Sequence, residues 1–173
     1  MLDSVTMSAA FVRNGRLDVI GANALGRALH APMFASPTAA VGGPNFARFH
    51  FLDDLSKDFF VDWEAGAAAT VALLRAEAGR DPHDKTLREL IGELSTASKE
   101  FSALWAAHDI RIRHEGPKRL QHPEIGALEV TYQSVHLPID NRAAHDLSFY
   151  TAEPGSPDEE RLRLLASWTA PSA

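Results

Sequence analysis

Histidine is the residue type whose abundance first suggests chemistry, because imidazole is the commonest metal ligand in proteins. The chain has eight: His30, His50, His83, His108, His114, His122, His136 and His145. No two of them have the i, i+4 spacing of ligands on one helix or the i, i+2 spacing of ligands on one strand. Cysteine is absent, which excludes thiolate ligands and disulfides. The sequence therefore predicts neither a metal site nor a bound cofactor.

The sequence also lacks the motifs of nucleophilic catalysis. It contains neither G-x-S-x-G nor S-x-x-K, and Ser95 and Ser98 precede Lys99 at other spacings. The Gly-Gly-Pro of residues 42–44 lacks the lysine of a phosphate-binding loop. The 23 acidic residues form so many possible carboxylate pairs that none is singled out. We therefore predict that the protein is not an enzyme.

Aromatic side chains at inward-facing positions are the remaining group that could bind a ligand. Helical and strand periodicity places the following on apolar faces: Phe46, Phe49, Phe60, Trp63, Phe101, Trp105, Tyr132 and Phe149. They either fill an ordinary core or line a cavity, and periodicity does not separate these alternatives. In a cavity, each buried methylene of a ligand contributes about 0.8 kcal/mol, so a twelve-carbon chain gains roughly 10 kcal/mol before its lost freedom is counted.

Apolar walls need a polar group to orient a ligand. The candidate anchors are Arg48, His108, Arg113 and Lys118. Arg48 lies at the helix edge that we expect to be nearest the cavity. A short basic cluster is most simply interpreted as a solvated edge; it comprises Arg111, Arg113, Lys118 and Arg119 around His114. Because the net charge of −6 would repel a phosphate backbone, we expect that this chain alone does not bind DNA.

Local patterns predict the elements that would position these residues in the first half of the chain. They indicate a hairpin over 11–20, a helix over 24–29 capped by Asn23, a loop over 36–44, and an aromatic helix capped by Asn45. The hairpin turn is expected at Asn14-Gly15, the strongest two-residue turn pair, because both positions accept positive φ.

Three amphipathic helices are predicted in the middle of the chain. One spans 59–77, the next begins at Asp84 or Lys85, and the third is capped by Ser98. The apolar residues of the first helix fall three or four apart, at Phe60, Trp63, Ala67, Val71 and Leu74. This spacing predicts that Phe60 and Trp63 lie on its inward face.

The C-terminal part predicts strands at 118–122, 128–132 and 147–150 and a closing helix. Val135 and Leu137 are out of phase with the alternation that precedes them, and a β-bulge near Gln133-Ser134 would restore their facing. The closing helix has a capping box and an apolar face, formed respectively by Ser156, Pro157 and Glu159 and by Leu162, Leu165 and Trp168.

The order of two strands, a helical middle, three strands and one helix favours an α+β fold. A five-stranded antiparallel sheet with helices packed on one face is the simplest architecture for that order. A length of 173 residues suits one domain with a sizeable core. The sequence shows no apolar run of membrane-spanning length and no signal peptide, so we expect a cytoplasmic protein that does not bind membranes.

Five blocks of the sequence carry a resemblance to a known family. The longest are GPKRLQHPEIGALEVTYQSVHLP (116–138) and SFYTAEPGSPDEERLRLLASW (148–168), and shorter ones span 13–34, 45–54 and 104–113. Together they resemble the MmyB-like ligand-binding domain, which follows a helix-turn-helix domain in a class of bacterial transcription regulators. The resemblance implies a PAS-like fold and a small-molecule sensor with a fatty-acid-type ligand. It further implies that 1–10 is a linker, that 11–170 is the sensor domain, and that an upstream DNA-binding domain is absent from this chain.

Two functional hypotheses follow. The first is a sensor that binds an apolar small molecule, possibly a fatty acid, between sheet and helices. Its expected ligand-binding residues are Phe46, Arg48, Phe49, Phe60, Trp63, Leu104, Trp105, His108, Val130, Tyr132 and Phe149. The alternative is a dimerisation module without a ligand, in which the closing helix or the N-terminal segment pairs across a two-fold axis. The two are compatible in a ligand-binding homodimer.

Overall fold

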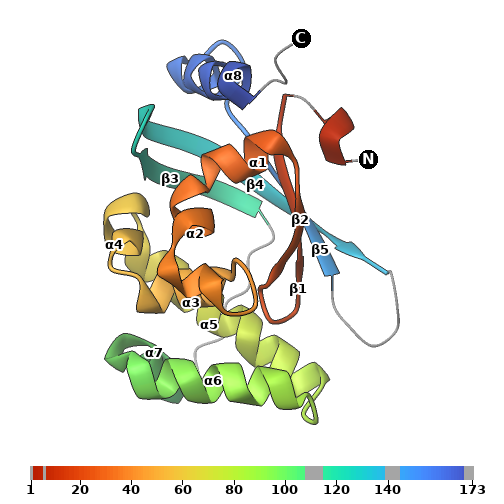
Figure 1. Cartoon of the computed structure of the whole chain (residues 1–173), viewed down its shortest axis with the longest axis vertical. Helices are drawn as coiled ribbons and strands as arrows, with labels where there is room; N and C mark the ends of the chain where they lie inside the picture. Colours follow the sequence, from red (N-terminus) through yellow and green to blue (C-terminus); the bar gives the residue numbers. More distant parts are fainter. Residues whose placement is uncertain (1, 6, 108–114, 139–144, 170–173) are drawn as a thin grey trace.

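Five strands form one antiparallel sheet in the computed structural model, which describes residues 2–5, 7–107, 115–138 and 145–169. The strands are β1 (Ala9–Asn14), β2 (Val19–Ala22), β3 (Glu115–His122), β4 (Gly126–Leu137) and β5 (His145–Thr151). Their spatial order is β2-β1-β5-β4-β3, so the first and last strands of the chain pair with each other inside the sheet (Figure 1). The predicted α+β class and five-stranded antiparallel sheet are confirmed.

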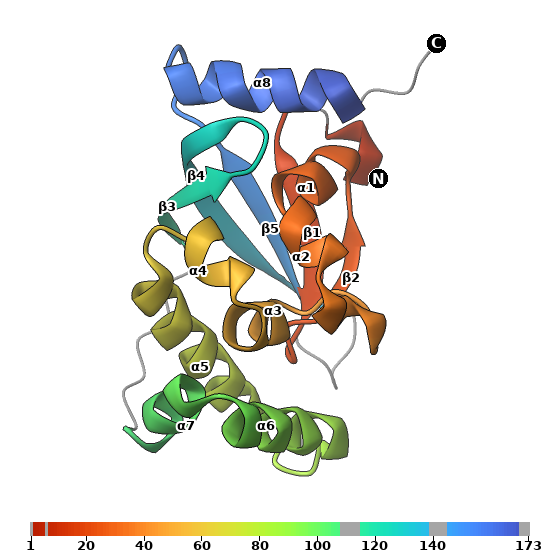
Figure 2. The same cartoon turned by 60° about the vertical axis from the view of Figure 1, so that its left-hand side comes forward.

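Helices pack on one face of this sheet (Figure 2). The helices of the described residues, of which α6 and α7 pack on other helices and not on the sheet, are η1 (Leu2–Ser4), α1 (Ala24–Leu29), α2 (Ala31–Ala35), η2 (Pro37–Ala40), α3 (Phe46–Leu52), α4 (Leu55–Phe59), α5 (Trp63–Arg80), α6 (Lys85–Ala97), α7 (Lys99–Ala106) and α8 (Pro157–Thr169). On the sheet, Phe11, Val130 and Tyr150 are buried toward the helices, whereas Glu129 and Thr131 point the other way and are exposed. The period-two alternation thus gives the sheet one buried and one solvated face.

The helix starts follow the capping side chains that the sequence predicts. Asn23, Asn45, Asp84 and Ser98 each accept a hydrogen bond from a backbone N–H in the first turn of the following helix. Ser156 does the same for α8, with 3.1 Å between its Oγ and the backbone nitrogen three residues later. These bonds satisfy amide groups that a helix leaves without internal partners. The four predicted caps, at Asn23, Asn45, Ser98 and Ser156, are therefore confirmed, and Asp84 is the cap of the helix that was expected to begin at Asp84 or Lys85.

The turn of the β1–β2 hairpin differs from its prediction. The Asn14 N–H donates to the Asp18 carbonyl at 3.1 Å, which closes a three-residue loop, so the predicted two-residue turn at Asn14-Gly15 is wrong. The positive φ, 67°, belongs to Leu17. Leu17 is buried beside Val71 and Leu74 of α5, and this apolar burial offsets a backbone conformation that costs about 1–2 kcal/mol for a residue with a side chain.

The segment before α5 is extended, so the predicted helix over 59–77 begins too early. Phe60 has φ −93° and ψ 106° and forms an isolated antiparallel bridge with Leu120 of β3. The next N–H, of Val61, donates to the Arg119 carbonyl at 3.2 Å. Phe60 still points inward, although it does so from a short strand-like segment against the edge of the sheet. A helical period cannot reveal this pairing, because its partner lies about sixty residues away in the sequence.

The predicted bulge in β4 is also absent. The pairing of β4 with β5 runs without a shift from Thr131↔Thr151 to Leu137↔His145. Val135, 53 % exposed, therefore lies on the outer face of the sheet, as does Phe149, whose neighbours Ser148 and Tyr150 face inward. The expectation that Phe149 faces the helices is wrong for this reason. On α8, Leu162 and Leu165 are buried as predicted, but Trp168 is 53 % exposed.

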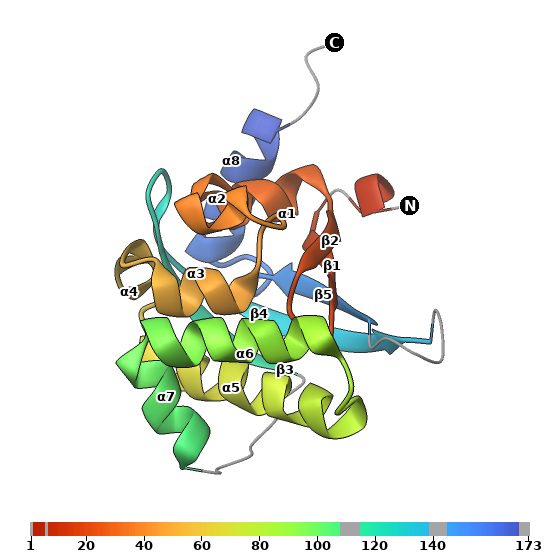
Figure 3. The same cartoon turned by 60° about the horizontal axis from the view of Figure 1, so that its bottom comes forward.

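The interior contains two apolar clusters. The first joins the inner face of the sheet to α1, α2, α4 and α8, with Phe11, Leu29, Phe59, Val130 and Leu165 among its members. The second joins α3, α5, α6 and α7, with Leu74, Leu87, Leu94 and Phe101 among its members. Figure 3 shows α5, α6 and α7 together as one group of helices. Phe46 packs against both clusters, at the boundary between them.

Candidate ligand-binding cavity

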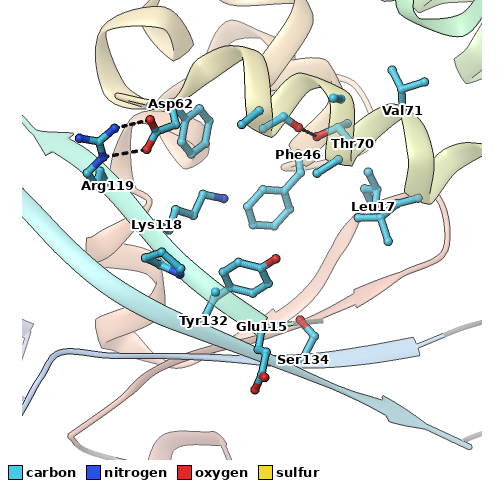
Figure 4. A pocket seen from close by; sticks show the side chains of 18 of the residues that line it. Leu17, Phe46, Asp62, Thr70, Val71, Glu115, Lys118, Arg119, Tyr132 and Ser134 are labelled. Atoms are coloured by element: carbon cyan, nitrogen blue, oxygen red, sulfur yellow. Dashed lines mark hydrogen bonds and ion pairs between the residues drawn. The ribbon is translucent and has the colours of Figure 1, made fainter. Parts of the chain in front are cut away.

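A cavity of about 610 Å³ lies between the inner face of the sheet and α5, at the boundary between the two apolar clusters (Figure 4). Small-molecule sites in proteins usually measure about 300–1,000 Å³, so the volume suits a metabolite-sized ligand. The sheet contributes Phe11, Tyr132 and Tyr150 to the wall, and the hairpin contributes Leu17. The helical side is lined by α5, with Leu104 at the end of α7.

The two long walls differ in side-chain size. On the sheet side Phe11 and Tyr150 have ring centroids 5.5 Å apart, and Phe46 of α3 packs on Phe11 with centroids 4.8 Å apart. On the α5 side most lining residues are small, namely Ala65, Gly66, Ala68, Ala69 and Thr70, and Val71 and Leu73 are the larger ones. An aromatic floor opposite a helix with short side chains leaves the space unfilled, because neither wall reaches the other.

Most charged groups of the wall are paired or point elsewhere. Asp62 and Arg119 form a two-point ion pair at the rim, with 2.9 Å between Arg119 Nε and Asp62 Oδ2. Arg13 is paired with Asp146, with 3.1 Å between Arg13 Nη2 and Asp146 Oδ2. The Glu115 carboxylate points away from the cavity in Figure 4. These residues therefore add little unbalanced charge to the interior.

Lys118 is the exception, and its ammonium group points into the cavity (Figure 4). Its Nζ lies 4.7 Å from the ring centroid of Phe60 and 5.9 Å from that of Tyr150. Within the described part of the chain no carboxylate forms a salt bridge with it. Burial, and secondly the charge of Arg13, lower the pKa of Lys118 to about 8. A lysine held by rings alone is suited to a negatively charged or electrophilic group of a ligand.

Hydroxyl groups complete the polar part of the wall. Ser134 Oγ lies 2.7 Å from Ser148 Oγ, on neighbouring strands, and Thr70 Oγ1 donates to the Gly66 carbonyl at 2.8 Å. Burial raises the pKa of the Tyr150 phenol, so this group stays neutral at physiological pH. Apart from its paired arginines and its two carboxylates, the wall thus combines the Lys118 cation with neutral hydroxyls and aromatic rings.

The structure brings together part of the predicted ligand-binding set. Phe46, Phe60, Leu104 and Tyr132 line the cavity, as does the candidate anchor Lys118. Whether they bind a ligand stays a prediction. The solvated edge proposed for the basic cluster is wrong at Lys118, which faces inward. His108 and Arg113 lie outside the described residues.

The other predicted residues lie elsewhere. Phe49 and Val130 are buried in the first apolar cluster, and Phe149 is on the outer face. Arg48 pairs with Glu93 of α6 at 2.9 Å instead of facing the cavity. Trp63 stacks on His50 and donates to its carbonyl at 3.2 Å. Trp105 stacks on Phe101 and under the Arg75 guanidinium. Each of these side chains has partners within the fold, which explains why it does not reach the cavity.

Several lining residues escaped the sequence analysis. Phe11 and Arg13 belong to β1, whose alternation places both on one face, and this pattern was visible in the sequence. The small residues of α5 were visible as the run over 65–70, but a run of alanines is equally typical of close helix packing. Leu17 was unforeseeable as a lining residue, because its direction depends on the loop conformation described above.

Two of the buried histidines, His50 and His122, have backbone partners. His122 accepts backbone N–H groups of the β3–β4 turn at Nδ1, and its Nε2 lies 3.0 Å from the Ala28 carbonyl. His50 Nε2 lies 2.9 Å from the Trp63 carbonyl, and burial lowers the pKa of His50 to about 4. Over the residues described, no three His, Cys, Asp or Glu side chains are grouped as a metal site would require.

An α+β domain with a cavity of this size and, among the described residues, one lining cation without a salt bridge has the features of a small-molecule-binding domain. Comparison with family models then identifies the group: the MmyB-like transcription regulator ligand binding domain matches residues 1–165, and the chain belongs to this family. The family is one of regulator domains rather than of enzymes. None of the curated proteins compared with the chain is similar enough to count as a relative. Among the described helices, none has the length and apolar character needed to cross a bilayer.

Proposed function

We propose that this domain is the sensor of a transcription regulator and that its cavity binds an amphiphile with a carboxylate head and an apolar tail, such as a fatty acid. The observation that supports this most strongly is Lys118, a cation in an aromatic wall without a carboxylate partner in the described residues. A charge in such a place is costly unless a ligand compensates it. The carboxylate would lie against the ammonium group and the tail along the small residues of α5.

Binding of dodecanoate by the purified protein, measured by isothermal titration calorimetry, tests this proposal. Lys118→Met should weaken binding by about 10- to 100-fold, because a charge-assisted hydrogen bond contributes about 1.5–3 kcal/mol. Lys118→Arg should retain most of the affinity, since it keeps the charge. Lys57→Met is the matched control, because Lys57 is 51 % exposed and lies outside the cavity. Equal affinity of Lys118→Met and the unchanged protein, or no binding at all, would contradict the proposal.

The rest of the regulator is proposed from the family. Residues 11–170 would be the sensor domain, with a PAS-like arrangement that the sheet order β2-β1-β5-β4-β3 supports. A helix-turn-helix domain upstream of residues 1–10 would contact DNA, and the regulator would act in the cytoplasm. Ligand binding would bias the regulator between two states, which requires different affinities of the ligand for those states.

Dimerisation is a second proposed function, which could accompany ligand binding. Exposed apolar side chains on the outer face of the sheet and on α8 support it; they include Val135, Leu164 and Trp168. Sedimentation equilibrium of the domain with and without dodecanoate tests it. A monomer under both conditions at high concentration would remove this function from the domain.

A further inference from the structure

We propose that Lys118 also captures aldehydes, forming a reversible imine with an apolar aldehyde that occupies the cavity. The inference rests on the proposed function, because the same cavity must accept the apolar tail. It adds a covalent chemistry that carboxylate binding does not require. The class of ligand is therefore a straight-chain aldehyde of medium or long chain length.

The surroundings of Lys118 are those of a nucleophilic lysine. Its amine faces the cavity between the rings of Phe60 and Tyr150, at 4.7 and 5.9 Å from their centroids. Arg13 lines the same cavity, and its positive charge disfavours a second one nearby. Lysines become nucleophilic when an apolar pocket desolvates them, and the rings beside Lys118 provide this condition. The charge of Arg13 acts in the same direction, although its salt bridge with Asp146 balances part of it. No carboxylate of the described residues pairs with the ammonium form and thereby keeps it protonated.

The neutral amine is present in a useful proportion. With a pKa of about 8, roughly one Lys118 side chain in ten is unprotonated at pH 7. For an ordinary lysine the proportion is fewer than about one in a thousand. The concentration of the attacking species is therefore more than about a hundredfold higher at this position.

The reaction balances without an oxidant or a reductant. The amine nitrogen attacks the carbonyl carbon, and the oxygen takes up a proton to give a carbinolamine. The carbon–oxygen bond then breaks, and the oxygen leaves as water with the second proton of the amine. The product is an imine between Nζ and the former carbonyl carbon, and hydrolysis by water reverses the step.

The other lysines of the chain provide internal controls. They are Lys57, Lys85 and Lys99. Lys57 is paired with Glu100 at 3.2 Å, and Lys85, 82 % exposed, is paired with Glu89 at 3.5 Å. Neither lines the cavity. Selective modification at Lys118 would therefore reflect its site and not general lysine reactivity.

Incubation of the protein with decanal and cyanoborohydride, which reduces an imine to a stable secondary amine, tests the inference. Peptide mass spectrometry then locates the modified lysine. We expect Lys118 to be modified at least tenfold more than each of the other three lysines. We also expect decanal to modify Lys118 more than acetaldehyde does at equal concentration. An excess of decanoate should protect it, because both compounds need the same cavity. Lys118→Arg should abolish the selective adduct, whereas Lys57→Arg, at an exposed lysine outside the cavity, should leave the adduct at Lys118 and decanoate binding as they were.

The outcomes separate this inference from the proposed function. Equal modification of all four lysines would overturn the inference. It would also be overturned if Lys118→Arg formed as much total decanal adduct as the unchanged protein. Decanoate binding without a decanal adduct would overturn the inference and leave the proposed function intact. Absence of both decanoate binding and the adduct would overturn both.

Discussion

At the scale of single residues, Lys118 shows why a charge in a sequence is hard to interpret. Its position in β3 alternates with Leu120 and His122, both buried, so a period of two already places it inward. The sequence does not reveal that aromatic rings and alanines surround its ammonium group, or that no carboxylate of the described residues forms a salt bridge with it. A basic residue near other basic residues is usually solvated, and that general tendency led the prediction away from the cavity.

The affinity for decanoate should depend on pH through Lys118. The ammonium form attracts the carboxylate, so we expect the affinity to fall by at most tenfold per pH unit as the pH rises above about 8. The titratable and charged groups near it include Arg13, Asp62, Glu115, Arg119, Tyr132 and Tyr150 of the wall and the buried His30 and His50. Burial raises the pKa of Tyr150 and lowers that of His30 to about 3, so neither changes charge near pH 8. Titration calorimetry from pH 6 to 9.5 measures this, and binding of decanol, which is neutral, should stay level. A decanoate affinity that is constant across this range would contradict the assignment.

His30 should make the fold sensitive to acid. Its ring is fully buried beside the rings of Phe11 and Tyr150, and neither ring nitrogen has a hydrogen-bond partner in the described part of the protein. Burial lowers its pKa to about 3, whereas the unfolded chain has the ordinary value of 6.5. Between these values the unfolded state binds more protons, so stability rises with pH and is lost as the pH falls from 6.5 toward 3. The loss at pH 5 is about 2 kcal/mol.

The substitution His30→Phe tests this acid sensitivity. It should leave stability at pH 7.5 unchanged or higher, because it replaces a buried polar ring without partners. It should also flatten the decrease between pH 7 and 5. Urea unfolding at several pH values measures both effects. The exposed His83, changed to Phe, is the control that should keep the original slope. An unaltered slope in His30→Phe would show that other groups cause the acid sensitivity.

At the scale of elements, the small residues of α5 set the size of the cavity. Ala69→Leu adds three carbon atoms to this wall, so we expect the preferred fatty acid to become shorter by about two to four carbons. Affinity for the longest ligands should fall by about 2 kcal/mol, the contribution of three buried methylenes. Displacement of bound decanoate by acids of 8 to 16 carbons measures the preference. Ala76→Leu, an exposed change on the same helix, should leave it as it was. If the ligand's apolar tail does not lie along α5, Ala69→Leu and Ala76→Leu should show the same preferred chain length.

Gly15, in the loop of the β1–β2 hairpin, lies against Glu77 of α5, so a side chain at this position should affect the stability of the fold. A Cβ at this position would lie 2.1 Å from Glu77 Cδ, and Glu77 is buried and paired with Arg80. We expect Gly15→Ala to destabilise the fold by about 1 kcal/mol or less, because the atoms it would meet are the far end of the flexible Glu77 side chain, which can shift. Gly79→Ala on the same helix meets no atom within 4 Å and should be neutral or stabilising. Thermal unfolding compares the variants, and the addition of Glu77→Ala should recover part of the loss.

Elements that depend on nearby residues were predictable, and elements that depend on distant ones were not. The caps at Asn23, Asn45 and Ser98 follow from a side chain and the backbone of the next turn. The strand-like conformation of Phe60 depends on β3, and the outward direction of Val135 depends on its register with β5. The same distinction holds for the site. The aromatic side of the cavity follows in part from alternation, whereas the gap opposite it depends on how far α5 lies from the sheet.

At the scale of the whole molecule, the cavity separates two apolar clusters that share Phe46. A ligand in the cavity would add apolar contacts between the sheet and the group of helices α5 to α7. Dodecanoate at 100 times its dissociation constant should stabilise the fold by about 2.7 kcal/mol and raise the midpoint of thermal unfolding by about 5–10 °C.

Hydrogen exchange with and without ligand should show where this stabilisation acts. Protection should increase in α5 and α7 more than in α8, which packs on α1 and β4 away from the cavity. A uniform increase over all helices would indicate that the ligand stabilises the domain without strengthening this boundary in particular.

The two sides of α5 have separate roles, and this bears on how the family diversifies. Ala67 and Leu74 are fully buried, and Leu74 holds the helix to the second cluster, whereas Ala65 and Ala68 line the hollow. Replacements on the hollow side alter what fits inside without loosening the side that anchors the helix. If the cavity binds the proposed ligand, a few nucleotide changes in one short stretch would be enough to alter which effector fits, while the scaffold stays the same.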